Sequence, residues 1–144
     1  MNTAIIDASV AVKWFVPEEF SERADALAES GWTLMAPRLI LLEVANTFWK
    51  KTRRQLMTLE DAQEHLAALP RFFDSLFEHH DLIAPALSLA CTLDHPVYDF
   101  VYLSGARRRN ALMVTADRKL VDRLKGSPFA NHIVHLADWE TRSS

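Results

Sequence analysis

The stretch TAIIDAS, residues 3–9, decides the fold class, because a short apolar run in it ends on an acid. Residues 3–6 predict a short strand buried on both faces, since parallel strands that helices cover on both sides are continuously apolar. Asp7 follows this strand directly. Ligands of open α/β sheets bind beyond the carboxyl ends of the strands. The stretch therefore predicts both a parallel sheet and the edge at which chemistry takes place.

Three further apolar segments predict strands, at residues 33–36, 111–115 and 132–135. Helices are expected over about 9–15, 17–30, 38–54, 58–69, from 85 onward, 96–109 and 118–124. Residues 70–82 fit either a kinked helix or a short strand near 76–78. Short strands that alternate with helices are typical of an α/β fold with a mainly parallel central sheet.

Individual residues refine some of these helices. Pro17 is expected at the first position of its helix, and Gly31 is expected as its C-terminal cap. Thr58 and Asp61 resemble a capping box at the start of a later helix. Gly105, inside a predicted helix, costs roughly 1 kcal/mol relative to alanine, and we interpret it as a position of close packing.

Length and composition fit one domain that covers residues 1–144, with 49% apolar and 24% charged residues. The single cysteine, Cys91, cannot form a disulfide within the chain, which suggests a reducing compartment. No apolar run approaches the ~20 residues that span a bilayer, and the N-terminus lacks the basic start of a secretory signal. A soluble cytoplasmic protein with no membrane partner is therefore expected.

Basic side chains gather in three clusters, although the net charge is −3. The clusters are Lys50, Lys51, Arg53 and Arg54, then Arg107, Arg108 and Arg109, and finally Arg118, Lys119, Arg123 and Lys125. Cations near helix C-termini are favourable by themselves, so solvated helix ends explain any one cluster. Contact with RNA phosphates is the alternative, and it is favoured if all three clusters flank one site.

Four acids interrupt apolar sequence near the predicted ends of elements, namely Asp7, Glu43, Asp99 and Asp117. Two full charges ~4 Å apart repel by about 4 kcal/mol at an effective dielectric of ~20. Such a cluster must retain protons or bind a cation, and carboxylate oxygens suit Mg²⁺ or Mn²⁺. Each aspartate could instead cap or complement a helix end. Glu43, in a helix interior, has no such role, and the histidines show no zinc-ligand spacing.

Glu43 lies in LILLEVANTFWK, residues 39–50, where a carboxylate costs free energy unless a partner compensates. We expect Glu43 to face a pocket of carboxylates with a cation as its partner, while its leucine neighbours face the core. Asn46, three residues later, shares this helix face and is expected to form hydrogen bonds at the same edge.

Four segments together show a family resemblance. They are IIDASVAVKWF (5–15), LLEVANTFWK (41–50), HPVYDFVYLSGA (95–106) and LMVTADRKL (112–120). In order, spacing and chain length the sequence resembles the PIN-domain ribonucleases, specifically the VapC-type toxins of bacterial toxin–antitoxin pairs. Phe100, where the family usually has a small residue, and Gly105, where a stronger helix former is common, depart from the pattern.

The resemblance implies a three-layer α/β/α sandwich and Mg²⁺- or Mn²⁺-dependent hydrolysis of RNA. Asp7, Glu43, Asp99 and Asp117 correspond to the acidic metal-site residues. Ser9, Asn46 and Thr115 correspond to residues that support them by hydrogen bonds. The resemblance also implies a homodimer, a small VapB-like antitoxin protein as inhibitor, and structured targets such as transfer or ribosomal RNA.

Two alternatives remain open at this point. A phosphoaspartate phosphatase of the dehalogenase type would have a second aspartate where Ser9 stands, and a receiver domain would have a lysine in HIVHLADWE, residues 132–140, which contains none. An inactive module that binds RNA or a partner without cleavage is the other alternative. The complete set of four acids favours an enzyme over such a module.

Overall fold

Five short parallel strands form the central sheet in the computed structural model, which describes residues 2–142. The strands are β1 (Thr3–Ile6), β2 (Thr33–Pro37), β3 (Ser75–Phe77), β4 (Leu112–Thr115) and β5 (Ile133–His135). Their order is β3-β2-β1-β4-β5, with parallel pairing throughout. The strands predicted from apolar runs are therefore present within one residue of their expected bounds, and β3 resolves the segment that the sequence left open.

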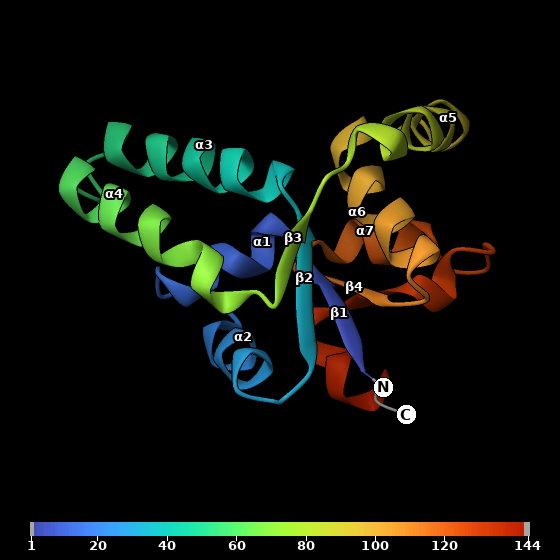
Figure 1. Cartoon of the computed structure of the whole chain (residues 1–144), viewed down its shortest axis with the longest axis horizontal. Coiled ribbons are helices and arrows are strands. Elements are labelled where there is room, and N and C mark those ends of the chain that lie inside the picture. The colour runs from blue at the N-terminus through green and yellow to red at the C-terminus, as the bar shows by residue number, and fades with distance from the viewer. Residues whose placement is uncertain (1, 143–144) are drawn as a thin grey trace.

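Helices cover both faces of this sheet (Figure 1). They are α1 (Ala8–Ala11), α2 (Ser21–Ala28), α3 (Leu39–Arg53), α4 (Leu59–Ala68), α5 (Ile83–Leu93), α6 (Val97–Arg108) and α7 (Arg118–Arg123). Figure 1 shows α1 to α4 on one side of the strands and α5 to α7 on the other. The protein is a three-layer α/β/α sandwich, as the sequence predicted. Within residues 2–142, no helix is long and apolar enough to cross a membrane.

The connections between the strands single out the ends of β1 and β4. From β1 the chain proceeds to β2 and then β3 on one side, whereas β4 and β5 lie on the other side of β1. The strand order thus reverses between β1 and β4, and this is the position at which open α/β sheets bind ligands. Residues directly after these two strands are placed together at this edge.

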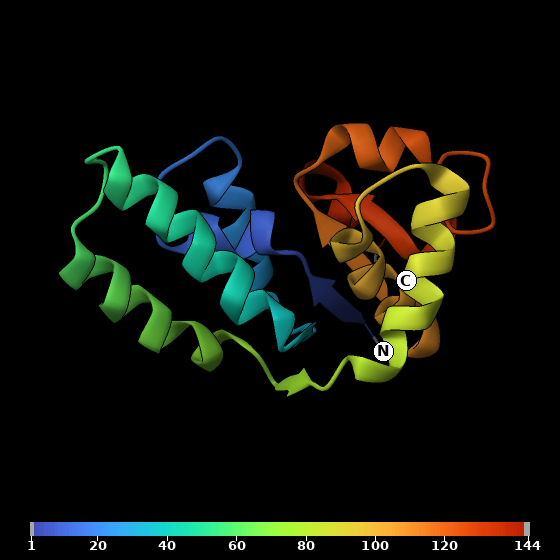
Figure 2. The same cartoon turned by 90° about the horizontal axis from the view of Figure 1, so that it is seen from above.

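Helix α6 is packed between the sheet and α5, and this packing holds the first turn of the helix, with Asp99, in place. Seven consecutive residues, from Phe100 to Ala106, are buried, because the sheet lies on one side of the helix and α5 covers another (Figure 2). Gly105 allows this packing, since a Cβ atom there would lie 2.8 Å from Cζ of Phe77 on β3. The interpretation of Gly105 as a position of close approach is correct.

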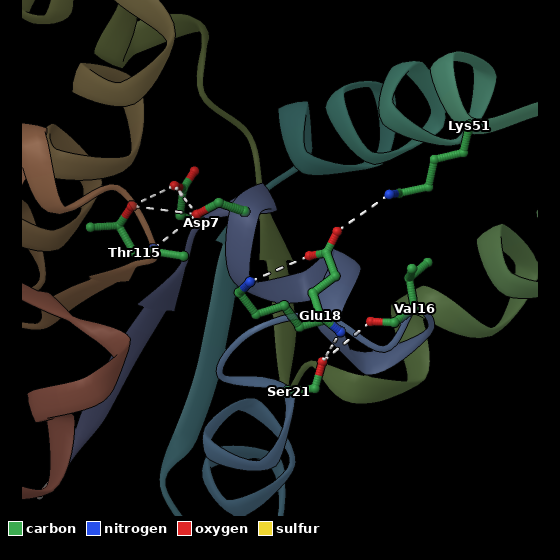
Figure 3. A network of polar contacts seen from close by, with 9 residues as sticks. Asp7, Val16, Glu18, Ser21, Lys51 and Thr115 are labelled. Carbon is green, nitrogen blue, oxygen red and sulfur yellow. Dashed lines mark hydrogen bonds and ion pairs between the residues drawn. The ribbon is translucent and has the colours of Figure 1, made fainter. Parts of the chain in front are cut away.

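The helix expected over residues 17–30 begins later and ends earlier than the sequence suggested, at Ser21 and Ala28. Phe20 adopts φ +68°, which interrupts a helix before Ser21. The backbone N–H of Glu18 donates to Ser21 Oγ at 2.9 Å. The side chain of Glu18 pairs with Lys13 and Lys51, each at 3.3 Å (Figure 3), so it does not complement the helix dipole.

Two other expectations about helix ends have different outcomes. Gly31 does adopt a left-handed conformation, with φ +84°, but it lies three residues beyond the last residue of α2 and is not its immediate cap. Thr58 does cap α4, because its Oγ1 accepts the backbone N–H of Asp61 at 3.1 Å. Helices α3 and α4 then form a hairpin that projects from the sheet (Figure 2).

Candidate active site

Asp7 lies directly after β1, at the position where the strand order reverses. Its backbone N–H donates to the carbonyl oxygen of Val114 at 3.0 Å, so pairing with β4 continues through Asp7. Its Oδ2 accepts hydrogen bonds from the Ser9 hydroxyl at 2.7 Å and the Thr115 hydroxyl at 2.8 Å. Figure 3 shows Asp7 and Thr115 side by side. The carboxylate is therefore held from both α1 and β4.

Burial and neighbouring charges make Asp7 an unusually weak acid. The residue is only 6% exposed. Burial, followed by the negative charge of Asp99, raises the pKa of Asp7 to about 7, with a smaller contribution from Glu43 and despite the hydrogen bonds from Ser9 and Thr115. Asp7, Asp99 and Glu43 thus share one electrostatic environment, although they belong to different segments of the chain.

Asp99 lies in the first turn of α6 and is held by His95. Its Oδ2 is 2.7 Å from His95 Nε2, and because an ionised carboxylate only accepts, the imidazole donates this hydrogen bond. The His95 ring packs edge-on against the buried ring of Phe100, with 5.3 Å between centroids. The aromatic residue that departs from the family pattern therefore supports the histidine that holds Asp99.

Glu43 has Tyr102 as its hydrogen-bond partner. The Tyr102 hydroxyl donates to Glu43 Oε1 at 2.6 Å. Burial raises the pKa of Glu43, the hydrogen bond from Tyr102 opposes this effect, and the charge of Asp99 adds to it. Glu43 therefore faces the other acids rather than open solvent.

The expectation that the leucines beside Glu43 face the core is wrong for one of them. Leu41 packs against the core, whereas 71% of Leu42 is exposed. Successive residues of an α-helix point ~100° apart, so Leu41 and Leu42 cannot both face inward when Glu43 faces the acids. Leu42 instead lies at the rim of a hollow beside the site.

Tyr102 links the three acids, and the sequence reasoning did not identify it. It is fully buried, and burial together with the charges of Asp7, Glu43 and Asp99 raises the pKa of Tyr102 above its usual range. The hydroxyl therefore stays protonated and can donate to Glu43. A signal was available, because Tyr102 is three residues after Asp99 and so shares its helix face, but a buried tyrosine in an apolar helix is equally typical of the core.

Asp117 has a structural role that the sequence had left open. Its Oδ1 accepts the backbone N–H of Leu120 at 3.1 Å and thereby caps α7. Its own backbone N–H donates to Thr115 Oγ1 at 3.1 Å, while Ser9 Oγ accepts the N–H of Ala116 at 3.0 Å. Asp117 is therefore tied to Asp7 through Thr115, at the same edge of the sheet.

The hydrogen bonds from the described residues to Asp7, Glu43 and Asp99 leave one oxygen of each carboxylate unused. In each of these acids they fall on a single oxygen, Oδ2 of Asp7, Oε1 of Glu43 and Oδ2 of Asp99. The second oxygen of each accepts no hydrogen bond from residues 2–142. Three carboxylates that repel one another, each with one oxygen unused, fit a hard divalent cation.

The side chains would have to approach one another to bind that cation. Among residues 2–142, no three histidine, cysteine, aspartate or glutamate side chains are arranged closely enough to hold one ion. Mutual repulsion of the acids opposes a tighter cluster in the absence of a cation. The hydrogen bonds from Ser9, Thr115, His95 and Tyr102 hold the acids at their present positions.

A hollow of about 550 Å³ opens beside Glu43. Asn46, which the sequence placed on the face of Glu43, lines this hollow together with Lys50 and Tyr98. Asn46 is exposed, and its side chain makes no hydrogen bond within the described residues. Its supporting role therefore stays a prediction, in contrast to Ser9 and Thr115, which contact Asp7 directly.

The basic residues predicted to contact RNA do not all lie near the acids. Lys50 lines the hollow beside Glu43, and Arg118 and Lys119 begin α7 directly after Asp117. The second cluster lies at the other end of α6, about 13 Å along the helix from Asp99. Asn110, which follows this cluster, lines a hollow with residues 2–3 at the start of β1. The second cluster therefore lies near the amino ends of the strands, opposite the edge that carries Asp7.

The second cluster has structural partners instead. Arg107 lies over the ring of Phe129 and Arg109 over the ring of Phe77, at 4.6 Å and 3.7 Å from the centroids. Arg108 pairs with Asp81. In the first cluster, Arg53 lies 4.7 Å from the ring of Trp49, while Lys51 pairs with Glu18. The three clusters therefore do not flank one site. Because Arg118 pairs with Asp138 at 3.1 Å, Lys50 and Lys119 remain the best-placed candidates for contact with RNA.

Comparison with known proteins identifies the family of the chain. The family model of the PIN domain matches residues 4–126, which include Asp7, Glu43, Asp99 and Asp117. The chain belongs to the PIN domain family. The family resemblance drawn from four sequence segments is thus confirmed.

Within the PIN family, the chain is similar to Ribonuclease VapC3 of Pyrobaculum aerophilum. The two are 33% identical over 121 residues, which cover 83% of this chain and 92% of the relative. This similarity places the chain among the VapC-type PIN-domain proteins.

Two solved structures share the PIN fold of this chain. The crystal structure of PAE2754 from Pyrobaculum aerophilum has a TM-score of 0.72 at 23% identity and covers 98% of this chain and 88% of that one. A toxin–antitoxin complex from Klebsiella pneumoniae has a TM-score of 0.64 at 16% identity and covers 92% of this chain and 97% of that one. At such low identity these likenesses support the fold alone.

Proposed function

We propose that the protein is a metal-dependent endoribonuclease that acts as the toxin of a toxin–antitoxin pair. The main support is the environment that Asp7 shares with Asp99 and Glu43, because burial, followed by the charge of Asp99 and more weakly that of Glu43, raises the pKa of Asp7 to about 7. A buried acid that is costly to ionise is a typical feature of a functional site. The similarity to a protein named Ribonuclease VapC3 supports the reaction type.

The unused oxygens of Asp7, Glu43 and Asp99 would hold Mg²⁺ or Mn²⁺. A bound divalent cation supplies Lewis acidity, which activates water as a nucleophile and neutralises charge on the phosphodiester. Ser9 and Thr115 fix the orientation of Asp7, while His95 and Tyr102 do the same for Asp99 and Glu43. Asp117 completes the site as an outer ligand or as a ligand of a second cation. Hydrolysis would leave a 5′-phosphate and a 3′-hydroxyl.

The proposed substrates are structured RNAs such as transfer or ribosomal RNA, and the proposed regulator is a small VapB-like antitoxin. The name of the Klebsiella pneumoniae neighbour, a toxin–antitoxin complex, supports a protein partner. Exposed apolar side chains on the α3–α4 hairpin, Trp49 at 52%, Leu56 at 67% and Leu59 at 66%, favour protein contact on that arm. A homodimer remains part of the same proposal.

Cleavage of RNA by the purified protein tests the proposal. We expect it to cut total cellular RNA at discrete sites when Mg²⁺ or Mn²⁺ is present and to stop when EDTA is added. Asp99→Asn should fold normally and not cut, whereas Asp25→Asn, a change of an exposed acid on α2, should cut like the wild type. Cleavage that persists in EDTA or in Asp99→Asn contradicts the proposal, and RNA retention without cleavage would favour a binding module.

Replacement of His95 should weaken cation binding without unfolding the protein. His95→Ala removes the donor to Asp99 Oδ2, and loss of such an outer partner typically costs ~10–100-fold in metal affinity. His95→Gln keeps a donor on a side chain of similar reach and should recover part of the loss. A titration with Mn²⁺ monitored by calorimetry measures both variants. Wild-type affinity in His95→Ala would show that His95 does not position Asp99.

A further inference from the structure

Tyr98 is an exposed aromatic residue next to a proposed metal-binding acid. It precedes Asp99 in the first turn of α6, and 56% of it is exposed. Within residues 2–142, no aromatic ring or guanidinium group packs on its ring. Trp49, another exposed aromatic residue, differs because Arg53 covers its ring. The Tyr98 ring is therefore an available apolar surface beside the acids.

Tyr98 lines the same hollow as Glu43. This hollow of about 550 Å³ is lined by Tyr98 from α6 and by Leu42, Glu43, Asn46 and Lys50 from α3. Its size lies within the ~300–1,000 Å³ range of small-molecule sites. Glu43 belongs both to this hollow and to the group of acids, so a ligand in the hollow would lie directly beside the proposed reaction site.

The polar groups of the hollow match the parts of one nucleotide. The Lys50 ammonium group can pair with a backbone phosphate. The amide of Asn46, which has no hydrogen-bond partner within the described residues, can both donate to and accept from a base edge. The Tyr98 face, with the apolar Leu42 nearby, suits the face of a base. An apolar protein segment would match this hollow less well, because an amide, an ammonium group and a carboxylate line it beside the apolar side chains.

We propose that Tyr98 positions the substrate by stacking on an unpaired base next to the scissile phosphate, with Asn46 and Lys50 contacting the same nucleotide. This inference rests on the proposed nuclease function and names the substrate class of that site as RNA with an unstacked, single-stranded nucleotide at the cut. Bases inside an A-form duplex are stacked on their neighbours, so their faces cannot reach a side chain. The protein would therefore select a loop, bulge or single-stranded end.

Fluorescence of 2-aminopurine tests this inference without cleavage, because stacking on an aromatic ring quenches this base. The probe is a single-stranded oligoribonucleotide that carries 2-aminopurine, and the same strand annealed to its complement is the duplex control. In EDTA, the wild-type protein should quench the single strand and not the duplex. Tyr98→Phe should bind equally well, and Tyr98→Leu should bind about 5- to 150-fold more weakly, as expected when one base loses its stacking partner.

Matched controls and kinetics separate this inference from the proposed function. Trp49→Leu removes an exposed aromatic ring that lies on α3 and does not line the hollow, and it should leave quenching unchanged. In Mn²⁺, Tyr98→Leu should raise KM for the single strand and keep most of kcat.

Equal quenching by the wild type and Tyr98→Leu, or quenching of the duplex alone, overturns the inference while cleavage stands. If Tyr98→Leu instead dissociates a dimer in sedimentation and leaves quenching unchanged, the surface joins two copies and the inference is also wrong. Failure of the wild type to cut any RNA overturns the proposed function, whatever the quenching shows.

Discussion

Asp7→Asn is expected to abolish RNA cleavage and, at the same time, to stabilise the metal-free protein above about pH 7. The cleavage rate should fall by more than the ~10–100-fold that changes in outer partners of a metal typically cost, because Asp7 is a proposed direct ligand. The amide of asparagine has nearly the same shape, and its oxygen can still accept the hydrogen bonds from Ser9 and Thr115. The fold should therefore be retained.

The gain in stability follows from the raised pKa of Asp7. In the folded protein this pKa is about 7, against 3.8 for an ordinary aspartate. Below about pH 4 the carboxyl is protonated in both the folded and the unfolded chain, and its ionisation costs nothing. Between about pH 4 and pH 7 the unfolded chain loses this proton while the folded protein retains it, so the folded protein loses about 4 kcal/mol of stability over this range.

Asparagine does not ionise, so the advantage of Asp7→Asn should grow with pH. It should be near zero at about pH 4 and approach 4 kcal/mol above pH 7, or about 10 °C in Tm for a chain of this size. Thermal unfolding in EDTA across this pH range measures the difference. The exposed Asp25 on α2 provides a matched control, since Asp25→Asn should show no such dependence. If Asp7→Asn instead unfolds at a lower temperature than the wild type, by the same amount at every pH, ionisation of Asp7 does not destabilise the folded protein.

The second large effect is expected from the cation itself. A divalent ion that binds only the folded protein stabilises it by about 2.7 kcal/mol at a hundred times its Kd. For a chain of this size, that corresponds to an increase in Tm of roughly 5–10 °C. A bound cation would also offset the burial and the charge of Asp99 that make Asp7 costly to ionise. Mn²⁺ or Mg²⁺ should therefore stabilise the protein more at pH 8 than at pH 6, because the ligands must be deprotonated to bind.

Variants of the acids determine where this stabilisation originates. Asp99→Asn should lose most of it, since Asp99 is the neighbour whose charge acts on both Asp7 and Glu43. Asp25→Asn should retain it in full. Differential scanning fluorimetry with Mn²⁺, Mg²⁺ and EDTA measures all three proteins. An equal Mn²⁺ effect in Asp99→Asn and the wild type would place the ion elsewhere.

The sequence predicted the sheet well because its strands are short continuous apolar runs, such as residues 3–6 and 111–115. It failed at the start of α2, where a proline followed by two glutamates is typical of a helix N-terminus. That segment is held instead by the pairing of Glu18 with Lys51, which is 33 residues away. Contacts of this kind depend on the tertiary fold, and local sequence rules do not detect them.

The acids of the candidate site were predictable from the sequence, whereas their hydrogen-bond partners were not. A carboxylate in apolar sequence is costly and therefore conspicuous, so Asp7, Glu43 and Asp99 stand out. Tyr102 and His95 do not, because a tyrosine in an apolar helix and a single histidine in a loop are common without any special role. The contact of Tyr102 with Glu43, at 2.6 Å, exists only once the fold brings α6 and α3 together. The contact of His95 with Asp99, at 2.7 Å, is local, since the two residues are four positions apart.

A calorimetric titration with Mn²⁺ near pH 7, repeated in buffers of different ionisation enthalpy, tests most directly whether Asp7, Glu43 and Asp99 form one cation site. The comparison of buffers counts the protons that leave the protein when the ion binds. Since the pKa of Asp7 is about 7, we expect roughly half a proton to be released from Asp7, and Asp7→Asn should eliminate this release. The absence of Mn²⁺ binding, or binding by the wild type with no proton released, would contradict the shared site.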